Sequence, residues 1–345
     1  MENITISIDA MGGDNGPSVT VPAAFKLLAR YPNIKLILVG NQDILNAKIA
    51  ATQNTKLQER IVVKHASEEV LMDELPSKAL RSKKDSSMRV AINLVKDGVA
   101  QACVSAGNTG ALMATARFVL KTLPGIDRPA ITTTFPTVVL NKSTHVLDLG
   151  ANIDSDASYL CQFAVMGSVL ASVIDNINRP KVALLNIGSE ENKGNEQIKK
   201  AAHILAGNKN INYVGFVEGD DIFKGNVDVI VCDGFIGNIM LKSIEGVLKL
   251  VAFYAKRNML RNIVTKVMAL LALPMLRRLY RDIDPGKYNG ATFIGLQGVV
   301  IKSHGSANVA AFYCALEKAV VEAEKQVPQR IRDELTKVLQ NSKLT

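Results

Sequence analysis

The residues with the clearest chemical meaning follow a short strand at the beginning of the chain. Isoleucines alternate with polar residues over residues 4–8 and lead into DAMGGDNGP at residues 9–17. Gly12 and Gly13 permit backbone angles and a close approach of the backbone that a side chain would prevent. The helix expected from about Ser18 points its free N–H groups back at this loop, which predicts an anion site. The candidate ligand-binding residues in this loop are Asp9, Gly12, Gly13 and Asp14.

A second glycine loop, AGNTGA at residues 106–111, also follows a short apolar run. Its glycines flank Asn108 and Thr109 at a predicted helix start, where backbone and side-chain donors are available together. Ser105 adds a hydroxyl group, so Ser105, Asn108 and Thr109 are candidates for ligand binding. Asn and Thr are also ordinary N-cap residues, and a purely structural role for this motif stays open.

Four further glycine-containing turns follow predicted strands. They are GAN at 150–152, GSEENKGN at 188–195, DGFIGN at 233–238 and HGSAN at 304–308. In open α/β sheets ligands bind at the carboxyl ends of the strands, so we expect all of these turns to lie at one edge of the sheet and share a cleft. Their candidate site residues are Asn152, Lys193, Asp233, Asn238, His304 and Ser306.

His304 is the candidate for proton transfer. Of the four histidines it alone lies in a Gly/Ser turn after a strand, where a general acid or base would be placed. Lys193 carries the charge to neutralise a phosphate, although an isolated loop lysine is usually exposed to solvent. Acidic residues such as Asp14 and Asp233 disfavour phosphate unless they orient a base, bind a metal or hold a loop, so a structural role is the alternative.

The recurring order of β-branched run, glycine turn and helical pattern predicts a parallel sheet with crossover helices. With 345 residues, 48% of them hydrophobic, the chain can bury a large core. No internal repeat or linker is visible, and we expect one α/β domain over residues 1–345, in one or two lobes. Four dispersed cysteines without a Cys-x-x-Cys pair favour a reducing cytosol. No run of about 20 apolar residues and no signal segment are visible, so neither secretion nor insertion into a bilayer is expected.

The net charge of +9 comes from one segment. Residues 246–281 contain eight Lys and Arg and no Asp or Glu, which leaves +1 for the remaining residues. The pattern over residues 244–282 predicts a basic amphipathic helical hairpin, with an apolar stretch at 267–276 that Pro274 interrupts. Such a segment can lie in a membrane interface. Its expected contact residues are Lys256, Arg257, Arg261, Lys266, Leu270, Leu271, Arg277 and Arg278.

Several chemistries lack their usual motifs. There is no G-x-x-x-x-G-K-[ST] or G-x-G-x-x-G sequence, which disfavours ATP and NAD, and no His-Glu-x-x-His or Gly-x-Ser-x-Gly sequence. We therefore expect no cofactor and no metal. Nucleic acid is disfavoured as a partner in spite of the basic charge, because aromatic residues are only 5% of the chain and Trp is absent.

Taken together, the motifs resemble those of the PlsX family of phosphate acyltransferases, which convert acyl carrier protein thioesters and inorganic phosphate into acyl phosphate and free carrier. They occur in order along essentially the whole chain: DAMGGDNGP, SAGNTGALMA, LDLGAN, LLNIGSEENKG, VGFVEG, DVIVCDGFIGN and HGSAN. The resemblance implies a three-layer α/β/α fold with a mostly parallel sheet, related to phosphotransacetylases and to isocitrate and isopropylmalate dehydrogenases. It also implies a cytoplasmic homodimer with a peripheral membrane contact, acting at the start of bacterial phospholipid synthesis.

Under this resemblance the site needs no covalent nucleophile, because phosphate itself can attack the thioester carbon. Gly12, Gly13, Asn108, Thr109 and Lys193 are then expected to hold the phosphate. Asn238 or nearby backbone N–H groups would stabilise the oxyanion, and His304 would protonate the departing thiolate or orient the phosphate. The chain departs from many relatives at Asn289, in the segment 284–295, where they carry a second glycine.

The hairpin has three possible partners under this resemblance: anionic lipid, the acidic acyl carrier protein, and the second subunit of the dimer. Contact with the membrane would suit delivery of acyl phosphate to the glycerol-3-phosphate acyltransferase that uses it. The alternatives for the whole chain are a phosphate acyltransferase for short acyl-CoA, a metal-dependent dehydrogenase of the same fold group, a nucleic-acid-binding protein and a non-enzymatic membrane scaffold.

Overall fold

The computed structural model describes residues 4–52, 54–283 and 289–341. Its strands are β1 (Ile4–Asp9), β2 (Ile34–Gly40), β3 (Ile61–His65), β4 (Ala102–Ser105), β5 (Ala130–Pro136), β6 (Ser143–Leu147), β7 (Lys181–Leu185), β8 (Asn212–Val217), β9 (Val229–Val231), β10 (Ala291–Ile294) and β11 (Val299–Lys302). Within the described residues these strands form one sheet in the order β3-β2-β1-β4-β11-β10-β5-β6-β9-β7-β8.

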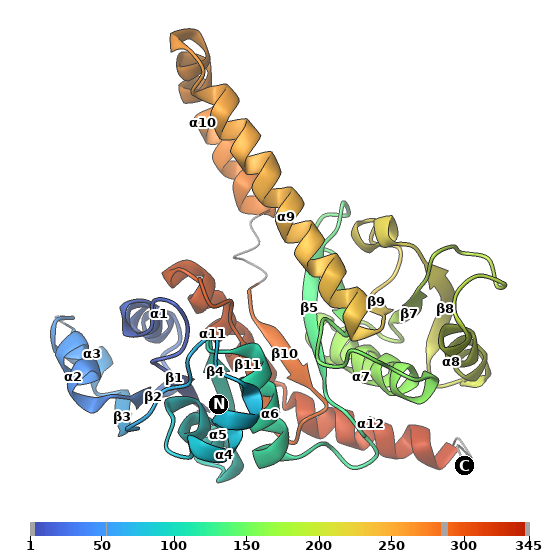
Figure 1. The fold of residues 1–345 in the computed structure, drawn as a ribbon, viewed down its shortest axis with the longest axis horizontal. Helices are drawn as coiled ribbons and strands as arrows, with labels where there is room; N and C mark the ends of the chain where they lie inside the picture. Colours follow the sequence, from blue (N-terminus) through green and yellow to red (C-terminus); the bar gives the residue numbers. More distant parts are fainter. Residues whose placement is uncertain (1–3, 53, 284–288, 342–345) are drawn as a thin grey trace.

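Helices cover both faces of this sheet. They are α1 (Pro17–Arg30), α2 (Gln42–Ala50), α3 (Thr55–Gln58), α4 (Pro76–Ser82), α5 (Ser87–Lys96), α6 (Thr109–Leu120), α7 (Ala157–Asp175), α8 (Glu196–Gly207), the 3₁₀ helix η1 (Gly219–Phe223), α9 (Gly234–Met259), α10 (Ile263–Ile283), α11 (Val309–Glu324) and α12 (Val327–Asn341). Figure 1 shows two lobes joined through β10 and β5, and a long helical arm above them.

Alternation along the strands divides the buried apolar residues between the two faces. On β4, Cys103 packs with α5 and α6, whereas Val104 packs with α1 and α11 on the opposite face. In the second lobe, Phe163 of α7 lies in the core that α7, α8 and α12 form on one face. The chain is therefore a three-layer α/β/α structure, and the predicted fold class is confirmed.

The strands of the two lobes run in opposite directions. Pairing is parallel from β3 to β11 and again from β6 to β8, but β10 is antiparallel to both β11 and β5, and β5 is antiparallel to β6. These three reversals put the carboxyl ends of β6, β7 and β9 at the opposite edge of the sheet from those of β1, β4 and β11. The prediction that all the glycine turns share one edge is wrong for this reason.

The twist of the sheet reduces the separation between the two edges. Neighbouring strands rotate by about 20–25°, so the four steps from β11 to β9 amount to roughly 80–100°. The carboxyl ends in the two lobes thus point in different directions without pointing directly away from each other. The lobes can present their loops to a common region, provided that another element connects them.

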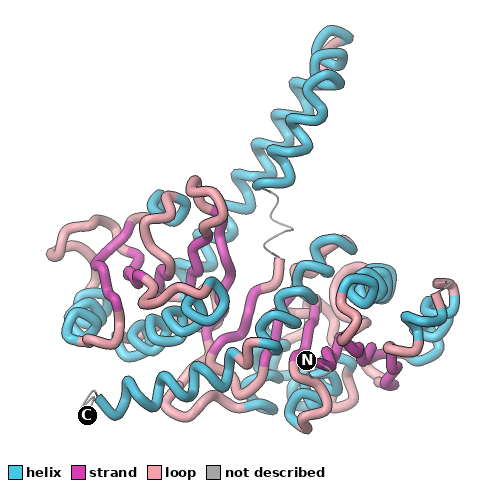
Figure 2. Tube along the Cα trace, turned by 180° about the vertical axis from the view of Figure 1, so that it is seen from behind, coloured by secondary structure: helices cyan, strands magenta, loops and turns pink. Residues whose placement is uncertain are grey.

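That element is α9, the first helix of the arm. It begins at Gly234, ten residues before the expected hairpin, because the Asp233 carboxylate accepts the Phe235 N–H at 2.9 Å and caps it. The helix leaves the second lobe and pairs with α10 beyond both lobes, as Figures 1 and 2 show from opposite sides.

The turn of the arm lies at residues 260–262. Asn262 Oδ1 accepts the Thr265 N–H at 2.9 Å, and Thr265 Oγ1 accepts the Asn262 N–H at 3.1 Å, which together cap the start of α10. Pro274, which the sequence suggested as a break, lies inside α10. The turn forms where the capping residues are, and the helix tolerates the missing N–H of proline.

One described helix is long and apolar enough to cross a membrane: α7, with 19 residues. The sequence expectation of no such run overlooked it. In the structure 67% of its apolar window is buried, and Phe163 and Met166 lie in the core of the second lobe. Burial in the protein core accounts for the hydrophobicity of α7.

Two glycines of α9 give a matched test of how closely this helix packs. A Cβ on Gly237 would overlap the carbonyl oxygen of Asp148, whereas a Cβ on Gly246 would meet nothing within 4 Å. We predict that Gly237→Ala lowers the free energy of unfolding by about 1–3 kcal/mol through overpacking. Gly246→Ala should raise it by about 0.5–1 kcal/mol, because alanine is the better helix former.

Urea unfolding of the two variants, followed by circular dichroism, measures both effects. Equal free energies of unfolding for Gly237→Ala and Gly246→Ala would contradict the close packing of α9 on Asp148, the residue after β6.

Candidate active site

Three loops at the carboxyl ends of β1, β4 and β11 meet in the first lobe. We call residues 10–16, 106–109 and 304–307 the first loop group. The Asp14 N–H donates to the Gly305 carbonyl oxygen at 2.9 Å. Gly13 has φ +87°, and a Cβ there would lie 2.8 Å from Ala106 Cβ and 2.9 Å from the Gly305 oxygen. The loops are therefore in backbone contact, and glycine is required at this position.

Asp9 lies beneath this group and holds it. The carboxylate is 1% exposed and accepts hydrogen bonds from the Ser87 and Ser105 hydroxyls at 2.6 Å each and from the Gly12 N–H at 3.2 Å. Burial raises the pKa of Asp9, and these donors oppose that shift. Because its oxygens are engaged inside the protein, the geometry gives Asp9 a role in shaping the loop.

Both the oxygen and the nitrogen of the Asn108 side-chain amide form hydrogen bonds within the protein. Its Oδ1 accepts the Ala111 N–H at 2.9 Å and caps α6, and its Nδ2 donates to the carbonyl oxygens of Met72 and Glu74 at 2.7 and 3.2 Å. The structural alternative for the AGNTGA motif therefore holds for this side chain. Thr109, the first residue of α6, is exposed and has no such commitment among the described contacts.

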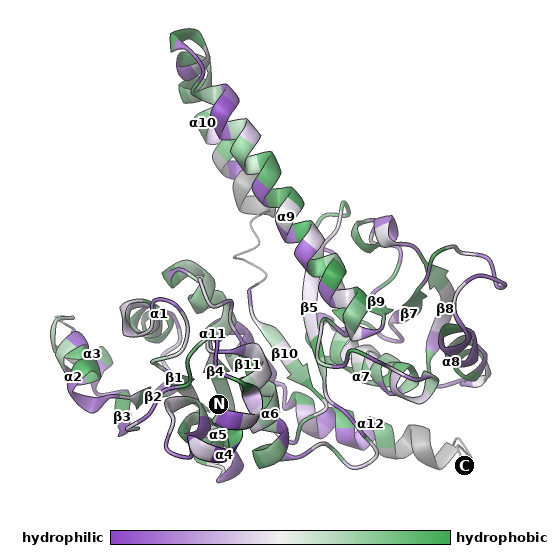
Figure 3. Ribbon diagram, in the orientation of Figure 1, coloured by the Kyte–Doolittle hydropathy of each residue, from purple (hydrophilic) through white to green (hydrophobic). Residues whose placement is uncertain are grey.

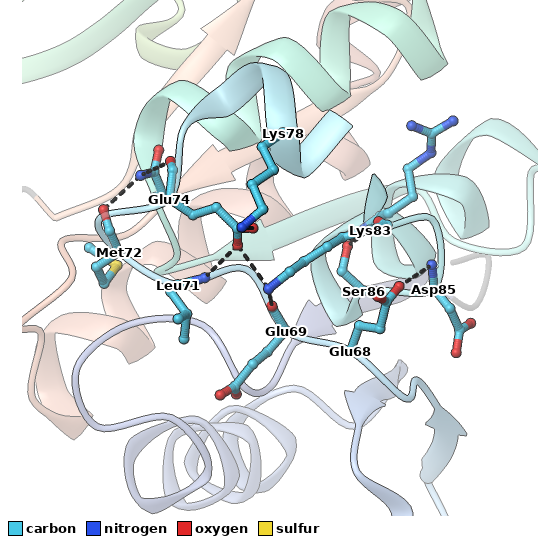
Figure 4. A network of polar contacts seen from close by, with 11 residues as sticks. Glu68, Glu69, Leu71, Met72, Glu74, Lys78, Lys83, Asp85 and Ser86 are labelled. Carbon is cyan, nitrogen blue, oxygen red and sulfur yellow. Dashed lines mark hydrogen bonds and ion pairs between the residues drawn. The ribbon is translucent and has the colours of Figure 1, made fainter. Parts of the chain in front are cut away.

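The segment that Asn108 holds is braced by its own polar network. Figure 4 shows Lys83 reaching the Glu74 carboxylate, where Nζ lies 2.8 Å from Oε2. The hydrogen bond from Lys83 lowers the pKa of Glu74. Glu74 also accepts the Leu71 N–H at 3.3 Å, and a Cβ on Gly305 would lie 2.7 Å from Met72 Cε. This bracing fixes Met72 against the third loop of the group.

His304 is held as a neutral hydrogen-bond donor. Its ring Nδ1 accepts the Ser306 backbone N–H at 3.2 Å and lies 2.9 Å from Ser306 Oγ. The backbone N–H of His304 donates to Asn289 Oδ1 at 2.9 Å. Burial lowers the pKa of His304, with further lowering by Lys242, Lys302 and Lys249 against an opposite effect of Glu245. With Nδ1 accepting, the proton of the neutral ring is on Nε2.

Asn289 supports this loop directly. Its Nδ2 donates to Ser303 Oγ and to the Ala311 carbonyl oxygen, each at 2.8 Å. The departure from relatives noted at this position thus places an amide that ties the HGSAN turn to α11. Residues 284–288 of the same segment lie outside the described part of the chain.

A second loop group lies in the other lobe, at residues 148–152 and 233–238. Asp148 is buried and accepts the N–H groups of Ile131, Ala151 and Asn152 at 2.8, 3.0 and 2.7 Å. Burial raises the pKa of this carboxyl group. Asn152 Nδ2 donates to Asp148 and to the Pro129 carbonyl oxygen, both at 2.9 Å, so Asn152 also serves the loop.

The side chains of Asn238 and Asp233 differ in their exposure and in their hydrogen bonds. Asn238 is exposed on α9 and lies beside Gly150, where a Cβ would be 3.2 Å from Asn238 Cβ. Asp233 caps α9 through Oδ1, while its Oδ2 is buried without a partner among the described residues. Of the two, Asn238 is the more exposed to solvent.

Lys193 is not brought to the first loop group. It lies exposed in the loop after β7, in the second lobe, and its carbonyl oxygen accepts Asn186 Nδ2 at 3.2 Å. Because β7 runs opposite to β1, this loop belongs to the other edge of the sheet. The prediction that Lys193 joins Gly12 and Gly13 in one site lacks support in this geometry.

Helix α9 joins the two loop groups. It starts beside Asp148 and Asn152, and two to three turns later Lys242 and Glu245 are close enough to His304 for their charges to act on its pKa. At 1.5 Å per residue, the eleven residues from Gly234 to Glu245 span about 16 Å. A ligand that reaches from one loop group to the other would therefore lie along the first turns of α9.

The sequence-predicted contact residues of the arm are exposed. This holds for Lys256, Arg257, Arg261, Lys266, Leu270, Leu271 and Arg278, whereas the side chain of Arg277 lies outside the described part. Large apolar residues are exposed along the same surface, including Ile263 at 80% and Leu271 at 77%. Figure 3 shows hydrophobic and hydrophilic residues interleaved along both helices.

Three buried residues of these groups escaped the sequence analysis: Ser87, Asp148 and Lys302. Asp148 lies within the LDLGAN motif and Lys302 lies two residues before HGSAN, so their positions at strand ends were the available signal. Over the described ranges no set of three or more His, Cys, Asp or Glu side chains is arranged to hold a metal ion.

Comparison with solved structures identifies the fold. A phosphotransacetylase from Streptococcus pyogenes superposes with a TM-score of 0.63 at 19% identity, covering 94% of each chain. A 4-hydroxythreonine-4-phosphate dehydrogenase from Klebsiella pneumoniae gives 0.52 at 17% identity, covering 93% of this chain and 100% of the other. These likenesses confirm the expected relation to phosphotransacetylases at the level of fold.

Sequence comparison identifies the family. Residues 4–330 match the family described as "Fatty acid synthesis protein". A protein from Nitrosococcus oceani named "Phosphate acyltransferase" is 59% identical over 329 residues, which are 95% of this chain and 96% of that protein. One of the same name from Coxiella burnetii is 57% identical over 335 residues, 97% of each chain. The chain therefore belongs to the PlsX family of phosphate acyltransferases and is an acyltransferase.

Proposed function

We propose that this acyltransferase takes its acyl group from an acyl carrier protein thioester and passes it to inorganic phosphate. The observation that carries the proposal is the backbone contact of three strand-end loops beside a neutral His304. Such a group offers N–H donors to phosphate, as loops at helix starts do. Asn238, in the first turns of α9, is exposed and is our candidate for contact with the thioester.

The reaction follows as a direct displacement. A phosphate oxygen adds to the thioester carbon and forms the acyl–oxygen bond, which places negative charge on the carbonyl oxygen. The carbon–sulfur bond then breaks as the carbonyl reforms, and the carrier leaves as a thiolate that takes a proton from solvent. The Nε2–H of His304 donates a hydrogen bond to the phosphate and orients it. The exposed amide of Asn238, or an N–H of its turn, stabilises the oxyanion that develops on the carbonyl oxygen.

The buried thiols and the buried Ser105 hydroxyl fit this scheme, because burial makes them poor nucleophiles. Burial raises the pKa of Cys103 and of Cys232, and it raises that of Cys161 to about 12. The Ser105 hydroxyl is buried and donates to Asp9. These buried positions therefore offer no thiolate and no activated serine, which supports phosphate as the nucleophile.

The exposed surface of the arm supports a proposal for where the enzyme acts in the cell. Exposed Arg257, Arg261 and Lys266 lie among exposed leucines and valines, a combination that binds the interface of an anionic membrane. We place the enzyme in the cytoplasm as a homodimer, peripherally bound to the membrane, where acyl phosphate passes to the glycerol-3-phosphate acyltransferase. The same basic surface suits the acidic acyl carrier protein.

The proposed donor is tested by offering the enzyme inorganic phosphate with an acyl carrier protein thioester or with the matching acyl-CoA. We expect acyl phosphate from the carrier thioester with at least about tenfold higher kcat/KM. The preference should fall with added salt, because charge complementarity speeds association. Acyl phosphate formed from short acyl-CoA and not from the carrier thioester would support the alternative donor and contradict the proposal.

The role of His304 as a neutral donor is tested by two substitutions. His304→Ala should lower kcat by about 10²–10³-fold, because a hydrogen bond to the reacting group is lost. His304→Gln, whose amide N–H can replace Nε2–H, should retain about tenfold more activity than His304→Ala. His203→Ala, at an exposed position of α8, is the control and should leave kcat unchanged.

Steady-state kinetics of these variants separates the two roles of His304. Equal losses in His304→Gln and His304→Ala would show that a titrating group is required, because glutamine cannot transfer a proton. Unchanged turnover in His304→Ala would remove His304 from the mechanism.

The membrane contact is tested by reversing charge at Arg257, Arg261 and Lys266 together. Each basic residue near an anionic surface contributes about 1 kcal/mol, so the triple glutamate variant should bind anionic vesicles at least about 100-fold more weakly. The matched control reverses three exposed lysines of the first lobe, Lys35, Lys56 and Lys64. Vesicle sedimentation measures binding, and unchanged vesicle affinity with an unchanged carrier KM would contradict a role for this surface.

A further inference from the structure

Asp9, Ser105 and Lys302 form a row across the sheet beneath the first loop group. Each is the last residue of its strand, and the register pairs Asp9 with Ser105 and Ser105 with Lys302. Residues in register point to the same face of a sheet. That face carries α5 and α6, since Cys103 and Val300, two residues earlier on β4 and β11, pack in the core with those helices.

Lys302 is the cation of this row. The residue is 8% exposed, and its Nζ donates to the Ala106 carbonyl oxygen at 3.2 Å and to the Ser303 carbonyl oxygen. Ala106 and Ser303 lead directly into two of the three loops of the first loop group. An ammonium has three N–H donors, so these bonds to described residues use two and leave one for a ligand.

The surroundings make this ammonium easier to deprotonate than an ordinary lysine. The pKa of Lys302 is lowered to about 8, chiefly by burial and also by Lys242, while Asp9 and Asp14 oppose the shift. A buried charge is costly unless it is paired. The Asp9 charge favours the ammonium, but its carboxylate accepts its hydrogen bonds from Ser87, Ser105 and Gly12, so a bound anion would add a direct contact to Lys302.

The structure describes no contact between Lys193, the other lysine considered for this role, and the first loop group. Lys193 lies exposed in the second lobe, at the opposite edge of the sheet from Gly12 and Gly305. Lys302, in contrast, holds the strand ends from which the anion-binding loops start. A fixed cation at that position attracts phosphate without ordering a flexible side chain, which lowers the entropic cost of binding.

We propose that Lys302 is the cationic ligand of the reacting phosphate, with its third N–H donating to a phosphate oxygen while the other two hold Ala106 and Ser303. The inference rests on the proposed function in taking that phosphate as the reactant. It assigns to a buried strand residue the charge neutralisation that the sequence analysis gave to Lys193.

Lys302→Met tests this assignment, because methionine keeps the length of the side chain and removes its charge and donors. Calorimetric titration with inorganic phosphate alone should show a Kd at least about tenfold higher, the effect of one charged hydrogen bond. The phosphate KM should rise in parallel, and the thioester KM should change less than about threefold. A Kd for phosphate within about twofold of the unaltered enzyme would overturn the proposal.

Lys318→Met is the matched control. Lys318 also donates to a backbone carbonyl, that of Gly290 at 2.8 Å, and burial lowers its pKa, but it lies on α11 away from the three loops. Its replacement should leave the Kd for phosphate unchanged. An equal loss of phosphate affinity in both variants would show a general effect of removing a buried charge and would overturn the assignment.

A measurement on the unaltered enzyme covers the case in which Lys302→Met does not fold. Sulfate keeps its charge above neutral pH, so its inhibition constant against phosphate should rise about tenfold between pH 7 and pH 9.5, as Lys302 loses its proton. The charged groups that face Lys302 are Asp9 of β1, Asp14 of the first loop and Lys242 of α9. An inhibition constant that stays constant over this range would overturn the proposal.

Lys302→Arg completes this set, since arginine stays charged over the whole range and should remove the pH dependence of sulfate inhibition. Binding and turnover are read separately. If phosphate binds through Lys302 but no acyl phosphate forms from any thioester, the proposed function fails while the phosphate site stands.

Discussion

The hydrogen bond from Asp14 N–H to the Gly305 carbonyl oxygen fixes two loops that are almost 300 residues apart in the sequence. It can form only because Gly13 takes φ +87° and carries no Cβ, which would otherwise meet Ala106 and Gly305. The third loop is held at the same place by the hydroxyl of Ser105, which bonds to Asp9. The position of His304 follows from this contact, since it precedes Gly305 in the same turn.

Because strand direction reverses between the lobes, the two loop groups lie apart, and α9 is the helix that connects them. Parallel strands alone would have placed every turn at one edge, but β10 and β5 reverse the direction and leave two groups of loops. Close packing of Gly234 and Gly237 on the β6 turn fixes where α9 starts. The direction of the helix then determines that Lys242 and Glu245 approach His304. A single helix thus connects the two loop groups.

The sequence predicted the local features and missed what depends on strand order. Strand-turn-helix junctions were visible because glycine and β-branched residues have strong local preferences, and the three-layer fold followed from them. The relative direction of β6 and β11 has no local signal, so the expectation of one shared edge was wrong and Lys193 was placed with Gly12. Asn108 and Asn152 were predicted as ligand groups, but the fold uses their amides. Lys302 was missed because a lysine after a run of valine and isoleucine resembles the exposed end of a strand.

The charges near the first loop group belong to two elements, the sheet and α9. Asp9 and Lys302 belong to the sheet, are almost fully buried and cannot leave their positions without breaking backbone contacts. Lys242, Glu245 and Lys249 belong to α9, which continues into the arm as one helix to Met259. Salt therefore screens these two buried groups less than it screens charges at the surface. Burial is the main cause of the lowered pKa of His304, and the charges that act on it lie both on α9, at Lys242, Glu245 and Lys249, and on the sheet, at Lys302.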